Sequence, residues 1–388
     1  MPPISDDTRN SILVAAHDLA PRLKERARRA AEARSVPVET IREMQERHLF
    51  RILQPARFGG AELDWETLCE VAQILARADG SQAWVLSLMA DHAQLIAGFP
   101  LRAQEDVWGE DPSTLVSVSI EASGRAKRVA GGFEVSGRHK FASGIDHASW
   151  LIFGGLIEEN GGELSGHHAF MVRKAQATVI DDWDTLGLEG TGSKSFEVRG
   201  VFVPDHRAVD ADLARSGRGP GIAVNSGITY RLPRSGITPV IFSALSVGMA
   251  KSVLDEWLNF AGPRRAGGVP LEQQHGNLFV AAEAEAEILA AEALYQTTLA
   301  RATRTLEAGG TLDDLDLAAG RRNAAYAVKL AIAAGHRLFA AGGGHALFNQ
   351  HHLGRQYRNL LASGAHFGVN WNVHAPAYGR MLLARRLG

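Results

Sequence analysis

The spacing of the hydrophobic residues changes twice along the chain, and this change most constrains the fold. Residues 5 to about 110 place apolar side chains at three- and four-residue steps, which is typical of helices with one buried face. From about 113 to 212 the pattern becomes short, β-branched and alternating, which is typical of strands. Beyond residue 236 the helical spacing returns. The sequence therefore predicts a mainly helical α+β protein with a β-rich unit between two helical ones.

The central segments predict an antiparallel β-barrel or sandwich. Runs such as WLIFGGLI and KSFEVRGVFVP are separated by glycine-rich turns at 131–132, 161–162 and 187–192. Several short strands spaced by such turns favour antiparallel pairing. We expect an N-terminal helical domain at 1–112, a central β-domain at 113–215, and a C-terminal four-helix bundle with a preceding loop at 216–388.

The stretch 213–236 is rich in Gly, Ser and Pro, and predicts a loop long enough to be functional. Beyond it, Ile288, Tyr295 and Leu299 lie on one face of a long helix. Two more helices are expected at 318–341 and about 356–386. We expect a ligand cleft where the β-domain meets these helices, because such junctions are common binding sites.

Composition excludes several classes of partner. The 388 residues carry a formal net charge of −2, from 41 Lys and Arg against 43 Asp and Glu, which gives no electrostatic reason to expect nucleic acid or an anionic membrane. Cys69 is the only cysteine, so neither an intramolecular disulfide nor a cysteine-held metal is expected. The N-terminus lacks a signal-peptide pattern, and no apolar run of about 18 residues occurs. We therefore expect a cytoplasmic protein without a membrane span.

Six segments, in this order and at this spacing, resemble those of the acyl-CoA dehydrogenase superfamily. They are LFRILQPARFGGAELDW, ADGSQAWVLSLMADH, VSGRHKFASGIDHASWLI, LGLEGTGSKSFEVRGVFVP, ALSVGMAKSVLD and RRAGGVPLE. No segment is decisive alone, but together they cover nearly the whole chain. The resemblance implies the three-domain fold, a homotetramer built on the C-terminal bundle, and a flavin between the β-domain and that bundle.

The superfamily contains dehydrogenases, which need a carboxylate to remove a proton from the substrate. At the two positions where the family places that base, this chain has Gln350 and Thr238, neither of which is a carboxylate. The segment RQYRNLLASGAHFGVNWNVHAPAYGR instead resembles the C-terminal helix of the oxygenase (hydroxylase) component of two-component flavin-dependent aromatic monooxygenases. One departure is Asn359, which follows Arg358 where that family has aspartate, and it puts in doubt the ion pair that the aspartate makes.

This second resemblance implies hydroxylation of an aromatic or polycyclic small molecule through a flavin C4a-hydroperoxide. Reduced FMN or FAD would diffuse from a separate flavin reductase, and O2 would be the cosubstrate. Ser143 would contact flavin N5 and support the hydroperoxide. His366 would act as a base or an orienting group, assisted by His92, because the pKa of histidine suits proton transfer near neutral pH.

The resemblance also implies which residues bind the cofactor, in addition to Ser143. Arg264 lies in the arginine loop that holds flavin phosphate across a subunit interface, and a planar guanidinium suits that anion. Trp84, Ser119 and Gly343 occupy further flavin-binding positions.

Simpler interpretations of these residues remain open. His366 could be a core histidine on an apolar helix face, Ser143 a turn residue, Arg264 a solvated charge and Trp84 a core side chain. The five histidines between 345 and 374 do not favour a metal, since adjacent His351 and His352 point apart and no Asp or Glu lies nearby.

Three other functions also remain possible. One is an acyl-CoA dehydrogenase with a displaced base. Another is a monooxygenase of the same fold that oxidises sulfur or an amine nitrogen. The third is a flavin-binding protein without catalytic activity.

Overall fold

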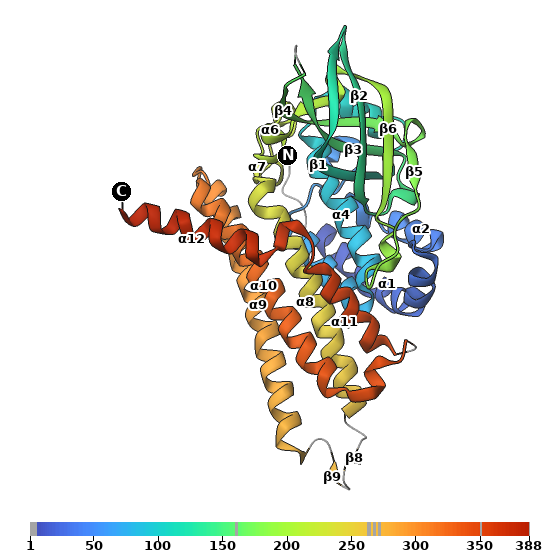
Figure 1. Cartoon of the computed structure of the whole chain (residues 1–388), viewed down its shortest axis with the longest axis vertical. Helices are drawn as coiled ribbons and strands as arrows, with labels where there is room; N and C mark the ends of the chain where they lie inside the picture. The colour runs from blue at the N-terminus through green and yellow to red at the C-terminus, as the bar shows by residue number, and fades with distance from the viewer. Residues whose placement is uncertain are drawn as a thin grey trace.

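A computed structural model describes residues 6–159, 162–261, 265–266, 269–270, 273–349 and 351–387. Figure 1 shows a β-sheet at one end, N-terminal helices beside it, and long C-terminal helices running away from it. The expected order of helices, strands and helices is confirmed. The division into domains at 112 and 215 stays a prediction.

The N-terminal helices are α1 (Asp6–Ala33), α2 (Val38–Glu46), α3 (Trp65–Ala78), α4 (Gly80–Ala97) and α5 (Leu101–Trp108). Two aspartates fix the starts of α3 and α4. Asp64 accepts a hydrogen bond from the Thr67 N–H at 2.7 Å, and Asp79 accepts one from the Gln82 N–H at 2.9 Å. Such caps satisfy N–H groups that have no partner inside the helix. They also fix where α4 begins, and α4 carries two of the predicted site residues.

The strands are β1 (Val116–Val129), β2 (Gly132–Ala142), β3 (Trp150–Glu158), β4 (Leu164–Arg173), β5 (Thr178–Ile180), β6 (Lys194–Pro204) and β7 (Ala208–Asp210). They form one sheet in the order β5-β6-β2-β1-β3-β4-β7. The expectation of purely antiparallel pairing is wrong at one place, because β1 and β3 run parallel. After β2 returns beside β1, the chain crosses to the other edge of β1, and β3 therefore runs in the direction of β1.

The segment 213–236 is not the unstructured loop that its composition suggests. It contains the end of α6 (Ala211–Arg215), a 3-10 turn and α7 (Ile228–Arg231). Side chains tie it down, since Asn225 donates to the Ala97 carbonyl at 2.9 Å and Gln94 donates to the Thr229 carbonyl at 2.6 Å. The segment therefore packs over the C-terminal end of α4.

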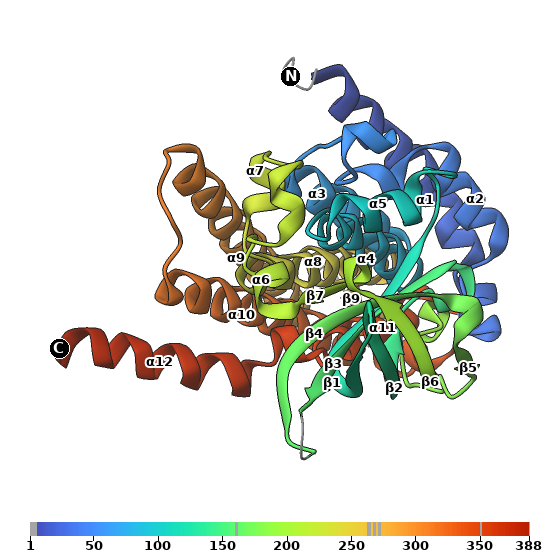
Figure 2. The ribbon, with the colours of Figure 1, turned by 90° about the horizontal axis from the view of Figure 1, so that it is seen from above.

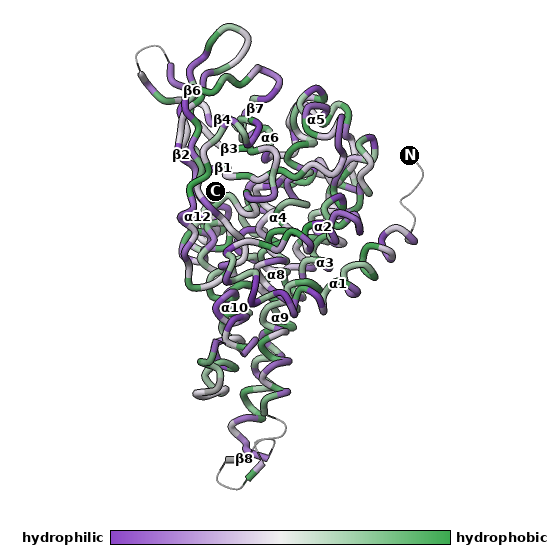
Figure 3. The backbone as a smooth tube through the Cα atoms, turned by 90° about the vertical axis from the view of Figure 1, so that its right-hand side faces the viewer, coloured by the Kyte–Doolittle hydropathy of each residue, from purple (hydrophilic) through white to green (hydrophobic). Residues whose placement is uncertain are grey.

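The C-terminal helices are α8 (Arg234–Ala261), α9 (His275–Glu307), α10 (Asp314–Ala341), α11 (His352–Ser363) and α12 (Trp371–Leu387). The short hairpin of β8 (Arg265–Ala266) and β9 (Val269–Pro270) lies at the far end of the molecule from the main sheet (Figure 3). Helix α8 packs against α9, α10 and α11 and also against α3, so it joins the bundle to the N-terminal helices.

The single helix expected at 356–386 is wrong, because the chain breaks between α11 and α12. Helix α11 ends at Ser363 with Gly364 as its C-cap, and a 3-10 turn at Phe367–Val369 follows. Helix α12 then leaves in a new direction and stands away from the bundle (Figure 2). The hydrophobic pattern continues across this break, so periodicity alone does not detect it.

By length and hydropathy, α8 resembles a membrane-spanning helix, although none was expected. Its most apolar window has a mean hydropathy of 1.6, but 83% of that window is buried inside the protein. This burial is what a core helix of the bundle requires.

We predict that His139 makes stability depend on pH. The ring is fully buried between Phe153 and Phe196, with ring centroids at 4.6 and 5.1 Å, and burial lowers the pKa of His139 to about 4. An unfolded histidine titrates near 6.5, so the unfolded chain binds more protons between these values. The free energy of unfolding should therefore fall, by at most about 3 kcal/mol from this group, as pH drops from 6.5 to 4.

Urea unfolding across this pH range should show a shallower pH dependence for His139→Gln than for the wild type. His168→Gln, on strand β4 of the same sheet and partly exposed, is the matched control. An unchanged slope in His139→Gln would contradict the assignment.

Candidate flavin and substrate site

One face of α4 carries the first part of the site. Trp84, Leu88 and His92 follow each other at four-residue steps, so they share a face of the helix. Every residue of α4 is buried except Leu88, which is partly exposed. This face is therefore least covered at Leu88, between Trp84 and His92, and we refer to this point as the opening.

A chain of hydroxyl groups leads from Trp84 into the β-domain. Trp84 Nε1 donates to Ser143 Oγ at 3.2 Å, Ser143 Oγ lies 2.8 Å from Ser193 Oγ, and Ser193 Oγ lies 2.7 Å from Thr191 Oγ1. Thr191 donates its only hydroxyl proton to the Leu188 carbonyl at 2.8 Å. Each hydroxyl has one proton, so Ser193 must donate to Thr191 and Ser143 must donate to Ser193. Ser143 Oγ is therefore an acceptor toward any further group.

Backbone geometry holds Ser143 against α4. Gly144 follows it with φ +67°, and a Cβ atom at this glycine would lie 2.7 Å from Met89 Cε and 2.8 Å from Val85 Cγ1. Only glycine fits both that conformation and that close approach. The turn after β2 therefore packs directly on α4, which brings Ser143 within reach of Trp84.

His366 lies at the break between α11 and α12 and not on a helix face, so that expectation is corrected. Its Nδ1 caps the following 3-10 turn by accepting from the Gly368 N–H at 3.0 Å. The ring lies 4.0 Å from the Phe242 ring of α8 and 5.9 Å from the Trp84 ring, measured between centroids. The break in the helix thus places His366 beside Trp84 and near Ser143.

The hydrogen bonds of the two histidines fix different tautomers. His92 Nδ1 lies 2.9 Å from the Val116 carbonyl, which only accepts, so Nδ1 carries the proton and Nε2 has the free lone pair. His366 Nδ1 accepts from Gly368, so in the neutral ring Nε2 carries the proton. Removal from water lowers the pKa of both imidazoles to about 4. At neutral pH the site therefore has an imidazole acceptor at His92 and an imidazole donor at His366.

The comparisons with known proteins agree on one family. Residues 9–109 match the model for the acyl-CoA dehydrogenase N-terminal domain, and residues 240–371 match the one for the C-terminal domain. The oxygenase subunit HsaA of a flavin-dependent monooxygenase from Mycobacterium tuberculosis is 33% identical over 359 residues, which are 92% of this chain and 91% of HsaA. The chain belongs to the flavin-dependent monooxygenases of the acyl-CoA dehydrogenase fold.

Two further relatives are similar over most of their length. The crystal structure of 3-HSA hydroxylase from Rhodococcus sp. RHA1 superimposes with a TM-score of 0.93 at 30% identity, covering 96% of this chain and 97% of that one. The oxygenase component of an FADH(2)-dependent resorcinol hydroxylase from Rhizobium sp. (strain MTP-10005) is 29% identical, covering 92% of this chain and 90% of that protein.

The other flavin positions implied by the family have no contact with Trp84, Ser143 or His366 among the interactions of the described residues. Ser119 Oγ donates to the Lys140 carbonyl at 2.6 Å, and it is Ser117 that bonds to the Ser143 backbone, at 2.9 Å. Gly343, with φ +59°, precedes α11, whereas His366 follows it. Twelve helical residues span about 18 Å, so Gly343 does not join the cluster within one subunit. Arg264 lies outside the described residues.

The two positions of the missing dehydrogenase base can be assessed only in part. Gln350 lies outside the described residues. Thr238 lies on α8, one helical turn before Phe242. Phe242, Thr191 and Ser193 belong to the cluster but were not predicted as site residues from the sequence. The TGS run at 191–193 was a signal for the two hydroxyls, but no local pattern marked Phe242.

Asn359 has a structural role in this family member. Its Oδ1 accepts from the Leu188 N–H at 2.7 Å, and its Nδ2 donates to Gln356 Oε1 at 3.3 Å. Gln356 Oε1 also accepts from the Gly80 N–H at 3.0 Å, while Gln356 Nε2 donates to the Ala76 carbonyl at 2.8 Å. A neutral amide thus joins α11 to the β-domain, in place of an aspartate and its ion pair.

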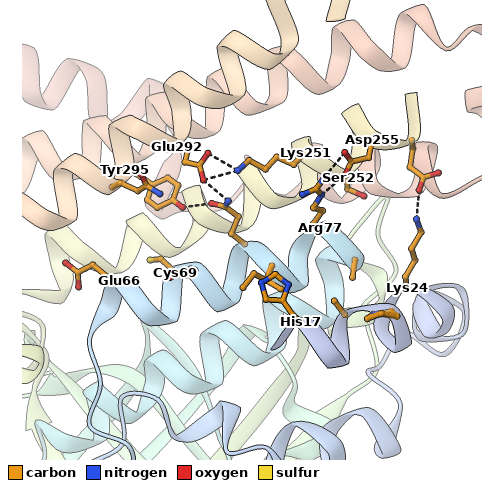
Figure 4. Close-up of a pocket in the computed structure, with 18 of the residues that line it drawn as sticks. His17, Lys24, Glu66, Cys69, Arg77, Lys251, Ser252, Asp255, Glu292 and Tyr295 are labelled. Atoms are coloured by element: carbon orange, nitrogen blue, oxygen red, sulfur yellow. Dashed lines mark hydrogen bonds and ion pairs between the residues drawn. The ribbon is translucent and has the colours of Figure 1, made fainter. Parts of the chain in front are cut away.

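A groove of about 1130 Å³ lies elsewhere, between α1, α3, α8 and α9 (Figure 4). Its charged walls are paired across the groove. Lys251 bonds Glu292 at 2.8 Å, and Arg77 pairs with Asp255. No residue of the Trp84–Ser143–His366 cluster lines this groove. Its size alone therefore does not make it the flavin site. The Arg77–Asp255 pair joins α3 to the bundle, and the Lys251–Glu292 pair joins two helices of the bundle, α8 and α9.

We predict that Asn359→Asp destabilises the protein. The new carboxylate can still accept from Leu188, but it would face Gln356 Oε1, an acceptor already held by Gly80. The hydrogen bond between residues 359 and 356 is then lost, because both atoms are acceptors. Burying these acceptors against each other costs about 1–3 kcal/mol of stability. Urea unfolding at pH 7.5 should show this loss, and the loss should shrink at low pH, where a protonated Asp can donate.

Asn372→Asp, at an exposed position at the start of α12, is the control. Equal stability of Asn359→Asp and wild type at pH 7.5 would show that the amide is not needed there.

Proposed function

We propose that this protein hydroxylates an aromatic compound, using reduced flavin and O2, as the oxygenase component of a two-component system. The observation that carries the proposal is the cluster of Trp84, Ser143, His366 and Phe242, whose contacts include one neutral histidine, His366, and, among the described residues, no carboxylate base. A second neutral histidine, His92, lies two turns along α4. A dehydrogenase reaction needs such a base. The relatives named as oxygenase subunits or components support the same choice.

The residues of the cluster suit a reduced flavin. Ser143 Oγ can only accept from a further group, which complements the N–H that a reduced flavin carries at N5. His366 Nε2 can donate to an oxygen atom beside the ring system. When bound, the reduced flavin supplies the electrons that activate O2. The buried Trp84 and Phe242 exclude water, which limits loss of the oxidant as hydrogen peroxide.

His92 is the proton acceptor for a phenol in this proposal. Its Nε2 lone pair is free because Nδ1 donates to Val116. It lies two turns along α4 from Trp84, with the opening at Leu88 between them. A phenol whose proton moves toward His92 becomes more electron-rich and reacts faster with an electrophilic oxygen. His366, which donates from Nε2, orients the oxygen donor instead.

The finer points of the system follow as proposals. We favour FAD over FMN, because one relative is named FADH(2)-dependent. The flavin would come from a separate reductase, since related proteins are named as oxygenase components or subunits. We also propose a cytoplasmic location, consistent with a single, buried cysteine, and cell fractionation would test it.

Purified protein mixed with chemically reduced FAD or FMN, oxygen and simple phenols tests the reaction. We expect hydroxylated product, more with reduced FAD, and little hydrogen peroxide. His92→Asn should lower product formation about a hundredfold, as expected for loss of a general base. Ser143→Ala and His366→Ala should divert the oxidised flavin toward hydrogen peroxide.

His275→Asn, at an exposed position on α9, is the control and should behave like the wild type. The absence of hydroxylated product with both flavins, together with no effect of His366→Ala, would refute the proposal. Unchanged product formation in His92→Asn would instead favour oxidation of sulfur or nitrogen, which needs no phenol base.

We further propose a homotetramer in which α12 packs on another subunit. Helix α12 stands away from the bundle, and Val373, Leu382 and Leu383 expose 40%, 44% and 65% of their surface. Exposed apolar side chains of this size on one arm favour a protein interface. Sedimentation of Leu382→Asp/Leu383→Asp should therefore show smaller assemblies than wild type. Val14→Asp, 59% exposed on α1, is the control, and a wild-type monomer would refute the proposal.

A further inference from the structure

Helices α4 and α8 face each other along a stripe that ends in two well-defined contacts. Arg234 at the start of α8 forms a bidentate ion pair with Asp91, at 2.6 and 2.7 Å. Eight residues later, Phe242 packs on Trp84 with ring centroids 5.0 Å apart. The helices are therefore antiparallel along this stripe. Thr238, four residues from each end, lies on the same face of α8.

The burial pattern shows where the two facing helices are least covered. From Gly236 to Ala250 every residue of α8 is buried except Thr238, which is partly exposed. In α4 the same exception is Leu88, halfway between Trp84 and His92. Because the helices are antiparallel, the two exceptions lie at the same level. The opening is thus lined by an apolar side chain on one helix and a hydroxyl-bearing one on the other.

The hydroxyl of Thr238 is buried and has no hydrogen-bond partner among the residues that the structure describes. A threonine inside a helix normally bonds to the carbonyl four residues earlier, here that of Arg234, and this bond is not made. Buried hydroxyls without a partner are rare, and each one calls for a specific explanation. The residue itself is partly exposed although its hydroxyl oxygen is buried, so rotation about a single side-chain bond is what would bring this hydroxyl to a ligand.

The nearest charges on the stripe are already neutralised. Arg234 is bound by both carboxylate oxygens of Asp91 and by Gln94 Oε1 at 3.1 Å. The Asp91 side chain is 2% exposed and that of Arg234 is 10% exposed. Neither is available to pair with a charged group on a ligand. The position next to Thr238 therefore suits an uncharged polar group.

We propose that Thr238 is a substrate-binding residue that hydrogen-bonds to an uncharged oxygen substituent of the aromatic substrate, such as a second hydroxyl, an ether or a ketone. This inference rests on the proposed function and narrows its substrate class. Leu88 forms the apolar wall opposite, His92 lies beyond one end of the opening, and Trp84 with His366 lies beyond the other.

Binding of matched phenols without turnover tests this inference. The protein, loaded with reduced FAD under anaerobic conditions, is titrated with catechol, resorcinol and hydroquinone, and with the three cresols that carry methyl in place of the second hydroxyl. We expect wild type to bind at least one hydroxyl compound about two- to tenfold more tightly than its cresol, the range of one neutral hydrogen bond. Thr238→Val should lose that preference, and Thr238→Ser should keep it.

A wild-type protein that does not prefer any hydroxyl compound, or a Thr238→Val variant that keeps the preference, would overturn the inference. Tighter binding of a hydroxybenzoate than of the matching cresol would overturn the claim that the substituent bound by Thr238 is uncharged. Admitting oxygen to the same samples separates the two proposals. The expected binding pattern, with no hydroxylated product from either reduced FAD or reduced FMN and no effect of His366→Ala, would refute the proposed reaction and leave the Thr238 assignment standing.

Discussion

The packing of α4 against α8 is the constraint on which the site depends. Helix α4 is buried except at Leu88, and α8 is buried from Gly236 to Ala250 except at Thr238. A polar side chain between these segments therefore destabilises the fold unless it has a hydrogen-bond partner. Asp91 and Arg234 satisfy each other at one end. At the other end the contact is aromatic, between Trp84 and Phe242. The few groups left with free donor or acceptor atoms between these ends are therefore the ones open to a ligand.

Much of the fold was predictable, because the helical and alternating patterns are local properties of the chain. Periodicity fails where the structure depends on contacts distant in sequence. The parallel pairing of β1 with β3 follows from a crossover that no strand pattern records. The break at Gly364 is similar, since the apolar residues continue through it while His366 caps the next turn.

Part of the site was predictable, because the type of a residue and its place in a family motif can be read from the sequence. Ser143, His366 and Trp84 were identified through the family resemblance, and the structure brings them together. Their hydrogen-bond roles were not predictable. The direction of the hydroxyl chain depends on Thr191 donating to a backbone carbonyl, and a sequence does not specify such a contact.

The difference between the two histidines shows why a protein of this fold can use neutral groups where a dehydrogenase uses a carboxylate. A buried carboxylate stays charged only with a compensating cation, as Asp91 does with Arg234. A buried imidazole stays neutral without one, since burial lowers the pKa of His92 and His366 to about 4. One backbone contact to each ring then decides whether it donates or accepts. A dry pocket can in this way contain a proton donor and a proton acceptor without any net charge.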